Sequence, residues 1–346
     1  SVYMEKEHIK KLLYSFLKGK EYLNKTVISQ NLSIIDEVIE SSEQNKSVKL
    51  VGIKNTSDID RNIIKKLVNN NKFFWHTIDK MSNNGRAIDI DLINPLTGRV
   101  MTGSSSGTAI NVFLGINDLG IGTDGGGSVI YPALSLNLYS FLGSGVNLKS
   151  SIIKKSTDNI EFSSGIGFIS RDLETLYSAV TTLIVNKCKE TTFKIAVLDN
   201  LEQDEKINNI HEKSFISNNF DSDDRIDIIN KLNIIFNKYD ILIAKEEMID
   251  FNSYGDSIIG NFGNKSKQFQ LNSNKKLGKV LNMMDLTAIT VPTCEISSSY
   301  IIIAKKGYDY IRPLFEIASL LEYKENLLTK KYFNDFLDNK NIIFQL

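Results

Sequence analysis

The chain has 346 residues, and its 41 Lys and Arg residues balance its 41 Asp and Glu residues, so the formal net charge is zero. Its pI is near 6.8, so it has no excess of positive charge that would favour binding to nucleic acid or an anionic membrane. No apolar run is long enough to span a bilayer. At 42% apolar residues it can bury a sizeable core.

The first predicted elements are two helices and two short strands. Residues 5–23 form an amphipathic helix, followed by a strand at 47–53, a second helix at 60–71 and a strand-like segment at 73–75. In the first helix, apolar residues recur at three- and four-residue spacing and predict a stripe that faces the core. These residues are Ile9, Leu12, Leu13, Phe16 and Leu17.

The composition changes at residue 94. Residues 94–150 hold most of the glycines, mixed with serine, and a plain loop of that length is unusual inside a compact domain. We expect short strands and helices joined by functional turns. The later elements are predicted as a helix at 168–185 opened by Ser170, a strand at 193–198, a helix at 223–239, strands at 240–244, 286–291 and 300–304, and a helix at 312–323.

Alternation of helices and strands along the whole chain predicts an α/β layered fold. The chain shows no internal repeat and no clean linker, so we expect a single domain over residues 1–346. The polar stretch 252–276 is predicted to be a mobile insert. Cys188 and Cys294 lie far apart and fit no metal spacing; they predict reduced, partly buried thiols in a cytoplasmic protein, with no metal.

The glycine-rich region allows two interpretations that need other residues for support. Residues 120–125 match the G-x-G-x-x-G pattern of a dinucleotide loop, but no helix can begin cleanly after them and no carboxylate follows at residues 143–147. Residues 103–107 match the G-x-S-x-G nucleophile elbow, which requires a downstream histidine. Only His211 is downstream, in a polar segment typical of an exposed surface residue.

A third interpretation takes both serine-glycine clusters together. The run Gly103-Ser104-Ser105-Ser106-Gly107-Thr108-Ala109, followed at fixed distance by Gly122-Thr123-Asp124-Gly125-Gly126-Gly127-Ser128 and Pro132-Ala133, resembles the amidase signature family. The resemblance extends to Gly52-Ile53-Lys54-Asn55 and, more weakly, to residues 166–183, 286–292 and 300–322. It implies a single large mixed β-sheet covered on both faces by helices (α/β/α), with a signature core at about 94–150.

The resemblance also implies a serine-serine-lysine site that hydrolyses amides without a cofactor. Ser128 would be the nucleophile, Ser104 the proton shuttle and Lys54 the general base, for which the lysine pKa must fall by roughly three units from about 10.4. The oxyanion hole would be formed by Gly125, Gly126 and Gly127 with the Ser128 amide. A cis peptide bond is implied at Gly103–Ser104 or at the next bond. Supporting residues are Gly103, Ser105, Thr123 and Asp124.

The chain departs from the family pattern at three positions near the site. Thr102 and Ser106 stand where glycine is usual, and Ile130 where arginine is common; we expect these changes to affect the substrate pocket and partner surface more than the chemistry. The expected partner is a small-molecule amide, without nucleic acid or membrane, and a homodimer is left open. Two alternatives remain: a subunit that releases ammonia from glutamine for a partner enzyme, and an inactive binding protein that has kept the fold.

Overall fold

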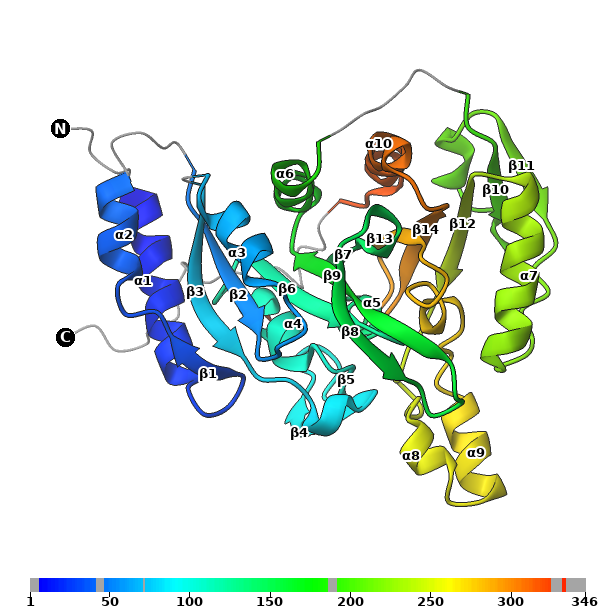
Figure 1. Cartoon of the computed structure of the whole chain (residues 1–346), viewed down its shortest axis with the longest axis horizontal. Coiled ribbons are helices and arrows are strands. Elements are labelled where there is room, and N and C mark those ends of the chain that lie inside the picture. Colours follow the sequence, from blue (N-terminus) through cyan, green and yellow to red (C-terminus); the bar gives the residue numbers. More distant parts are fainter. Residues whose placement is uncertain (1–5, 42–46, 71, 186–191, 325–331, 334–346) are drawn as a thin grey trace.

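The computed structural model describes residues 6–41, 47–70, 72–185, 192–324 and 332–333, and these form a 12-stranded mixed sheet with helices on both faces (Figure 1). A second, two-stranded sheet holds β4 (Ile88–Ile93) and β5 (Val100–Thr102). Across the large sheet the strands are ordered β1 (Val27–Gln30), β3 (Phe73–Asp79), β2 (Lys49–Lys54), β6 (Leu119–Asp124), β9 (Glu161–Ser170), β7 (Tyr139–Leu142), β13 (Thr287–Pro292), β14 (Ser299–Ala304), β12 (Ile241–Glu246), β10 (Ile195–Leu198) and β11 (Lys213–Ile216), and β8 (Lys149–Lys155) pairs with β9. The predicted mixed-sheet fold class is confirmed.

Alternation along the strands divides the core between two helical layers. On β2, for example, Val51 and Ile53 pack under one layer, and Leu50 faces the other. The first layer consists of α3 (Arg61–Val68), α6 (Leu173–Leu183) and α10 (Ile311–Leu321). The second consists of α1 (Lys6–Glu21), α2 (Ile34–Ser41), α4 (Ser106–Phe113), α5 (Ile130–Ser135) and α7 (Arg225–Lys238).

The predicted helix at 168–185 begins later than expected. Residues up to Ser170 belong to β9, and α6 starts at Leu173 with Asp172 as its N-cap, whose side chain accepts a hydrogen bond from the Thr175 amide. The Ser170 hydroxyl instead donates to the Asp172 carbonyl, at 2.5 Å. Apolar β9 residues resemble the start of a helical stripe because a buried strand and a buried helix look alike over a few residues.

The apolar stripe of α1 is only partly a core face. Leu12 is buried, but Ile9, Leu13 and Leu17 are exposed. The helix lies at the margin of the sheet, where it reaches only a small cluster that includes Leu50. The predicted core-facing stripe is therefore wrong for three of its five residues. No helix of the described residues is both long enough and apolar enough to cross a bilayer.

The polar stretch 252–276 forms two short helices, α8 (Ser257–Gly260) and α9 (Asn264–Leu271), which project together from one end of the molecule (Figure 1). Asp256 caps α8, and the rings of Tyr254 and Phe269 meet edge to face with centroids 5.5 Å apart. These local contacts explain why a stretch without an apolar pattern is ordered as a helical pair. Its mobility stays a prediction.

Candidate active site

Three segments of the chain meet at the C-terminal ends of two neighbouring strands. Strands β2 and β6 are parallel neighbours. Their last residues, Lys54 and Asp124, therefore lie at the same end of the two strands. Ser104 lies between β5 and α4, and Ser128 lies between β6 and α5. The structure thus brings together Lys54, Ser104 and Ser128, which the sequence places 50 and 24 residues apart.

Lys54 is buried, with 3% of its surface exposed, as predicted for a residue at the end of an apolar strand. Its Nζ contacts the Ser104 Oγ at 2.7 Å, the Thr123 Oγ1 at 2.8 Å and the Thr123 carbonyl at 3.3 Å. Burial lowers the pKa of Lys54 to about 7, although the carboxylate of Asp124 opposes the shift. A large fraction of this amine is therefore neutral near pH 7 and able to accept a proton.

The two serines are joined through the backbone of Ser104, whose amide donates to the Ser128 Oγ at 3.5 Å. Among the described residues, no hydroxyl–hydroxyl hydrogen bond links them. Ser104 is buried, whereas Ser128 is partly exposed and can meet a substrate.

The predicted cis peptide bond is wrong, because every peptide bond of the described residues is trans. The turn before Ser104 is made instead by Gly103, at φ +74°. A Cβ at this glycine would lie 2.2 Å from the Pro132 Cγ, so the position requires glycine for its space as well as for its backbone conformation. Gly103 thereby allows the Ser104 segment to approach the start of α5.

Asp124 organises the loop that carries Ser128 with its carboxylate. One oxygen accepts the Gly127 amide at 2.8 Å, and the other accepts the amides of Val129 at 2.8 Å and Ile130 at 3.3 Å. Burial raises the pKa of Asp124, and the three amides oppose the shift. Of the three glycines predicted for an oxyanion hole, Gly127 thus has its N–H engaged by Asp124.

Ser105 connects the two serine loops. Its amide donates to the Ser128 carbonyl and its hydroxyl to the Thr123 carbonyl, both at 3.3 Å. It is fully buried, so its contacts hold the two loops in register and leave it no access to a substrate. Ser105, Thr123 and Asp124 thus all contact the loops that carry Lys54, Ser104 and Ser128.

The departures from the family pattern lie in the interior. Thr102, Ser106 and Ile130 are each at most 1% exposed, so the expectation that they shape a partner surface is wrong. The Thr102 hydroxyl donates to Asp250 at 2.9 Å, and the Ser106 hydroxyl donates to Asp89 at 2.6 Å. The hydroxyls are compatible with burial because each has a carboxylate acceptor.

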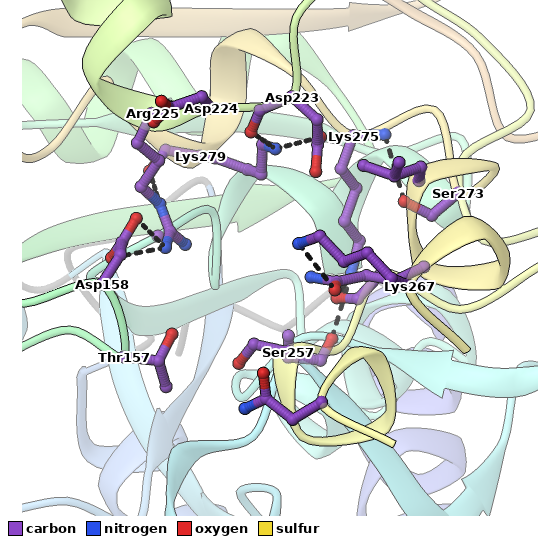
Figure 2. Close-up of a pocket in the computed structure, with 16 residues that line it drawn as sticks. Thr157, Asp158, Asp223, Asp224, Arg225, Ser257, Lys267, Ser273, Lys275 and Lys279 are labelled. Atoms are coloured by element: carbon purple, nitrogen blue, oxygen red, sulfur yellow. Dashed lines mark hydrogen bonds and ion pairs between the residues drawn. The ribbon is translucent and has the colours of Figure 1, made fainter. Parts of the chain in front are cut away.

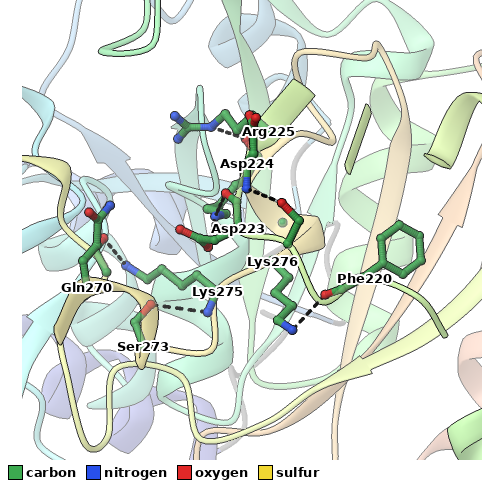
Figure 3. Close-up of polar contacts among 12 residues, drawn as sticks. Phe220, Asp223, Asp224, Arg225, Gln270, Ser273, Lys275 and Lys276 are labelled. Carbon is green, nitrogen blue, oxygen red and sulfur yellow. Dashed lines mark hydrogen bonds and ion pairs between the residues drawn. The ribbon is translucent and has the colours of Figure 1, made fainter. Parts of the chain in front are cut away.

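A cavity of about 360 Å³ lies against this site, with Gly126 in its wall (Figure 2). Its other walls come from the β8–β9 turn, the start of α7, the α8–α9 pair and the segment after it. Figure 3 shows that the segment after α9 contacts the chain before α7: the Lys276 Nζ donates a hydrogen bond to the Phe220 carbonyl at 2.8 Å. Among the charged lining residues are Asp158, Asp223, Asp224, Arg225, Lys267, Lys275 and Lys279.

No motif in the sequence identifies these lining residues, because they come from four separate segments without a shared pattern. None of the described residues forms a cluster of three or more His, Cys, Asp or Glu side chains suited to a metal ion. Cys294 is exposed rather than partly buried, and Cys188 lies outside the described residues.

The structure contradicts both rival interpretations of the glycine-rich region. Gly120 and Gly122 lie inside β6 rather than in a loop after it, and the next helix begins at Ile130, so no dinucleotide loop is formed. For the elbow, Ser105 is fully buried. His211 is exposed and precedes β11, which is at the far edge of the sheet from β2 and β6.

Comparison with known proteins finds similarity to solved structures, whereas no family model and no curated protein matches the sequence. An allophanate hydrolase of Kluyveromyces lactis is 13% identical with a TM-score of 0.62, over 96% of this chain and 72% of that one. An amidase family protein of Bacillus anthracis is 11% identical with a TM-score of 0.60, over 91% and 88%. A glutamyl-tRNA(Gln) amidotransferase component of Thermotoga maritima is 15% identical with a TM-score of 0.59, over 93% and 94%. The chain therefore has the fold that these proteins share.

Proposed function

We propose that this chain is an amidase that hydrolyses a carboxamide bond through an acyl-enzyme on Ser128. The observation that carries the proposal is the buried Lys54, whose Nζ lies 2.7 Å from the Ser104 Oγ and whose pKa is lowered to about 7. A lysine beside a hydroxyl with a pKa near 7 is suited to general-base catalysis near pH 7. The fold shared with amidases supports the same reaction class.

In the first half of the reaction, the Ser128 Oγ bonds to the carbonyl carbon while its proton passes through the Ser104 hydroxyl to the neutral Lys54 amine. The C–N bond then breaks, and the proton returns through Ser104 to the leaving amine. In the second half, water attacks the Ser128 ester with the same groups accepting and returning its proton. The products are a carboxylic acid and an amine, and Ser128 is regenerated.

The negative charge that develops on the carbonyl oxygen requires hydrogen-bond donors. We assign this role first to the Gly125 and Gly126 amides with that of Ser128, because the Gly127 amide already donates to Asp124. Gly127 would then act by keeping the loop in shape. This assignment reduces the predicted oxyanion hole from three glycines to two.

The test is covalent labelling with a fluorophosphonate, with the adduct located by mass spectrometry. We expect the label on Ser128, and we expect Lys54→Met to slow labelling by about 10³-fold or more because the base is lost. His211→Ala is the control and should label at the rate of the unchanged protein. Absence of label from Ser128 in folded protein would overturn the proposal and favour the inactive binding protein.

The amidotransferase alternative differs in its dependence on a partner. It receives support from the fold shared with the glutamyl-tRNA(Gln) amidotransferase component. Hydrolysis of a small amide by the isolated chain supports the amidase. Release of ammonia from glutamine only when a second protein is added would favour the alternative. Gel filtration of the same preparation tests the homodimer.

A further inference from the structure

One wall of the cavity beside Gly126 is made by Arg225, the first residue of α7. Its Nη1 donates to both carboxylate oxygens of Asp158, at 3.0 and 3.1 Å, and its Nε donates to the Lys279 carbonyl at 3.3 Å (Figure 2). Its Nη2 has no acceptor among the described residues. A Cβ at Gly126 would lie 2.7 Å from this Nη2, so the free edge of the guanidinium lies against the nucleophile loop.

Two of the other cations of the cavity are paired with carboxylates, and the third donates to a neutral oxygen. Lys279 pairs with Asp223, and Lys275 pairs with Asp250 at 2.8 Å. Lys267 hydrogen-bonds the side-chain oxygen of Gln270 at 3.3 Å. The Nη2 of Arg225 is the atom nearest to a Cβ placed at Gly126, so it is the donor that lies beside the glycine loop.

None of the described acidic residues at this wall accepts a hydrogen bond from the Nη2 of Arg225. Asp224 caps α7 by accepting the Ile226 amide at 3.0 Å, and Asp223 holds Lys279. Asp158 contacts the Nη1 of Arg225, and the N-terminus of the 14-residue α7 adds positive potential at the same place. The helix N-terminus and the Nη2 of Arg225 are the features of this wall that attract an anion, whereas the charges of Asp158 and Asp224 oppose it.

We propose that Arg225 determines specificity by binding a carboxylate of the substrate through Nη1 and Nη2 together, and that this carboxylate displaces Asp158 from Nη1. The inference rests on the proposed amidase function. A guanidinium fork matches a carboxylate in geometry, and Asp158 demonstrates that the site accepts one. Because the side chain of Asp158 is 38% exposed, its pair with Arg225 contributes little to stability and is readily exchanged.

The position of Arg225 limits the length of the substrate. The guanidinium faces Gly126, two residues before Ser128 in the sequence, and from this we infer a carboxylate a few bonds from the scissile carbonyl. The substrate class is therefore short amides that carry a carboxylate. Malonamate, succinamate and glutaramate place the acid one, two and three methylenes from the amide, and 4-oxopentanamide is a neutral analogue of succinamate.

A purely structural role for the pair makes a different prediction. If Arg225 only fastened the β8–β9 turn to α7, breaking the pair from either side would have the same effect on all substrates. If Arg225 binds the substrate, Arg225→Met loses the anion site, whereas Asp158→Asn removes a competitor for it. The two variants then change the apparent affinity for an acidic amide in opposite directions.

The experiment measures kcat and KM for the three acidic amides and for 4-oxopentanamide. We expect Arg225→Met to lower kcat/KM for the preferred acid by about 10- to 100-fold, the effect of losing a charged hydrogen-bond pair, with little change for the neutral amide. We expect Asp158→Asn to lower KM for the acid several-fold. Arg61→Met, on the exposed start of α3, is the matched control. Equal effects of both variants on acidic and neutral amides would overturn the proposal.

Calorimetric binding of the same acids to Ser128→Ala separates this proposal from the proposed reaction. Binding that is weakened by Arg225→Met supports the anion site even if Ser128 takes no fluorophosphonate. Labelling of Ser128 with no Arg225-dependent binding of any of the three acids overturns the anion site and leaves the amidase function standing.

Discussion

The Lys54 cluster and the Arg225 wall both adjoin residues 122–128, since Lys54 contacts Thr123 and Arg225 lies beside Gly126, but their cations have opposite environments. Lys54 is 3% exposed, has only uncharged oxygens as hydrogen-bond partners, and its pKa is lowered to about 7 by burial. The Arg225 side chain is 20% exposed and is paired directly with a carboxylate. Burial without a directly paired carboxylate creates a base, whereas a solvated ion pair keeps a full charge that can be exchanged for a ligand.

The test of this contrast with the largest expected effect is the pH dependence of the rate at which the fluorophosphonate labels Ser128. Lys54 acts as a base only when neutral, and below its pKa of about 7 the neutral fraction falls tenfold for each pH unit. We therefore expect the labelling rate to rise with pH and level off above about 7, with a loss of roughly 100-fold at pH 5. Rates measured from pH 5 to 9 check this expectation.

Two variants distinguish the Lys54 cluster from the Arg225 wall when the pH dependence of Ser128 labelling is measured. The positive charge of Lys154 lowers the pKa of Lys54, so Lys154→Met should move the rise to higher pH. Arg225→Met should leave the position of the rise unchanged, because the charges that shift the pKa of Lys54 most are those of Asp124, Lys154 and Asp58. The proposed separation is wrong if the pH at which the labelling rate rises is unchanged in Lys154→Met but shifted in Arg225→Met. Arg225 would then affect the pKa of Lys54.

The second test concerns the loop that both regions adjoin. Gly127 has φ +109°, and a Cβ there would lie 2.3 Å from the Tyr131 ring. That ring is held in place by the Tyr131 hydroxyl, which donates to Glu246 at 2.9 Å. Gly127→Ala combines backbone strain with this clash, so we expect it to lower the free energy of unfolding by about 3 kcal/mol and to slow Ser128 labelling.

Gly263→Ala is the matched control for this loop. Gly263 has φ +99°, but a Cβ there would meet no atom within 4 Å, so only backbone strain of about 1 kcal/mol is expected. Denaturant unfolding measures both variants. Equal losses of stability would mean that the Tyr131 ring moves aside and that the loop is less constrained than its contacts indicate.

The difference between the regions also explains what the sequence could predict. Lys54, Ser104 and Ser128 lie in segments that resemble the amidase signature family, and it is this resemblance that predicted their association before the structure. Asp158 and Arg225 are 67 residues apart in a turn and a helix start. Only the pairing of β8 with β9 and the position of α7 bring them together, and neither can be obtained from local pattern.

The same reasoning applies to the errors in the fold. The predicted start of α6 is wrong because buried strand residues resemble a helical stripe, and the decisive side-chain cap comes from Asp172 rather than Ser170. The exposure of Leu13 and Leu17 depends on where α1 meets the sheet, which periodicity does not specify. Local pattern predicts most of the elements, whereas exposure and cavity walls require the tertiary arrangement.

The smallest expected effect is at Thr102, one of the departures from the glycine pattern. Its hydroxyl donates to the buried Asp250, which also pairs with Lys275 at 2.8 Å and accepts the Gly255 amide at 2.8 Å. Thr102→Val keeps the shape but removes one of three donors, so we expect unfolding to be easier by about 1 kcal/mol, with Ser128 labelling unchanged. Thr192→Val, at an exposed position, is the control. If Thr102→Val slowed labelling without loss of stability, the hydroxyl would contribute to the chemistry through Gly103 and Ser104, and the Lys54 cluster would extend further than its direct contacts.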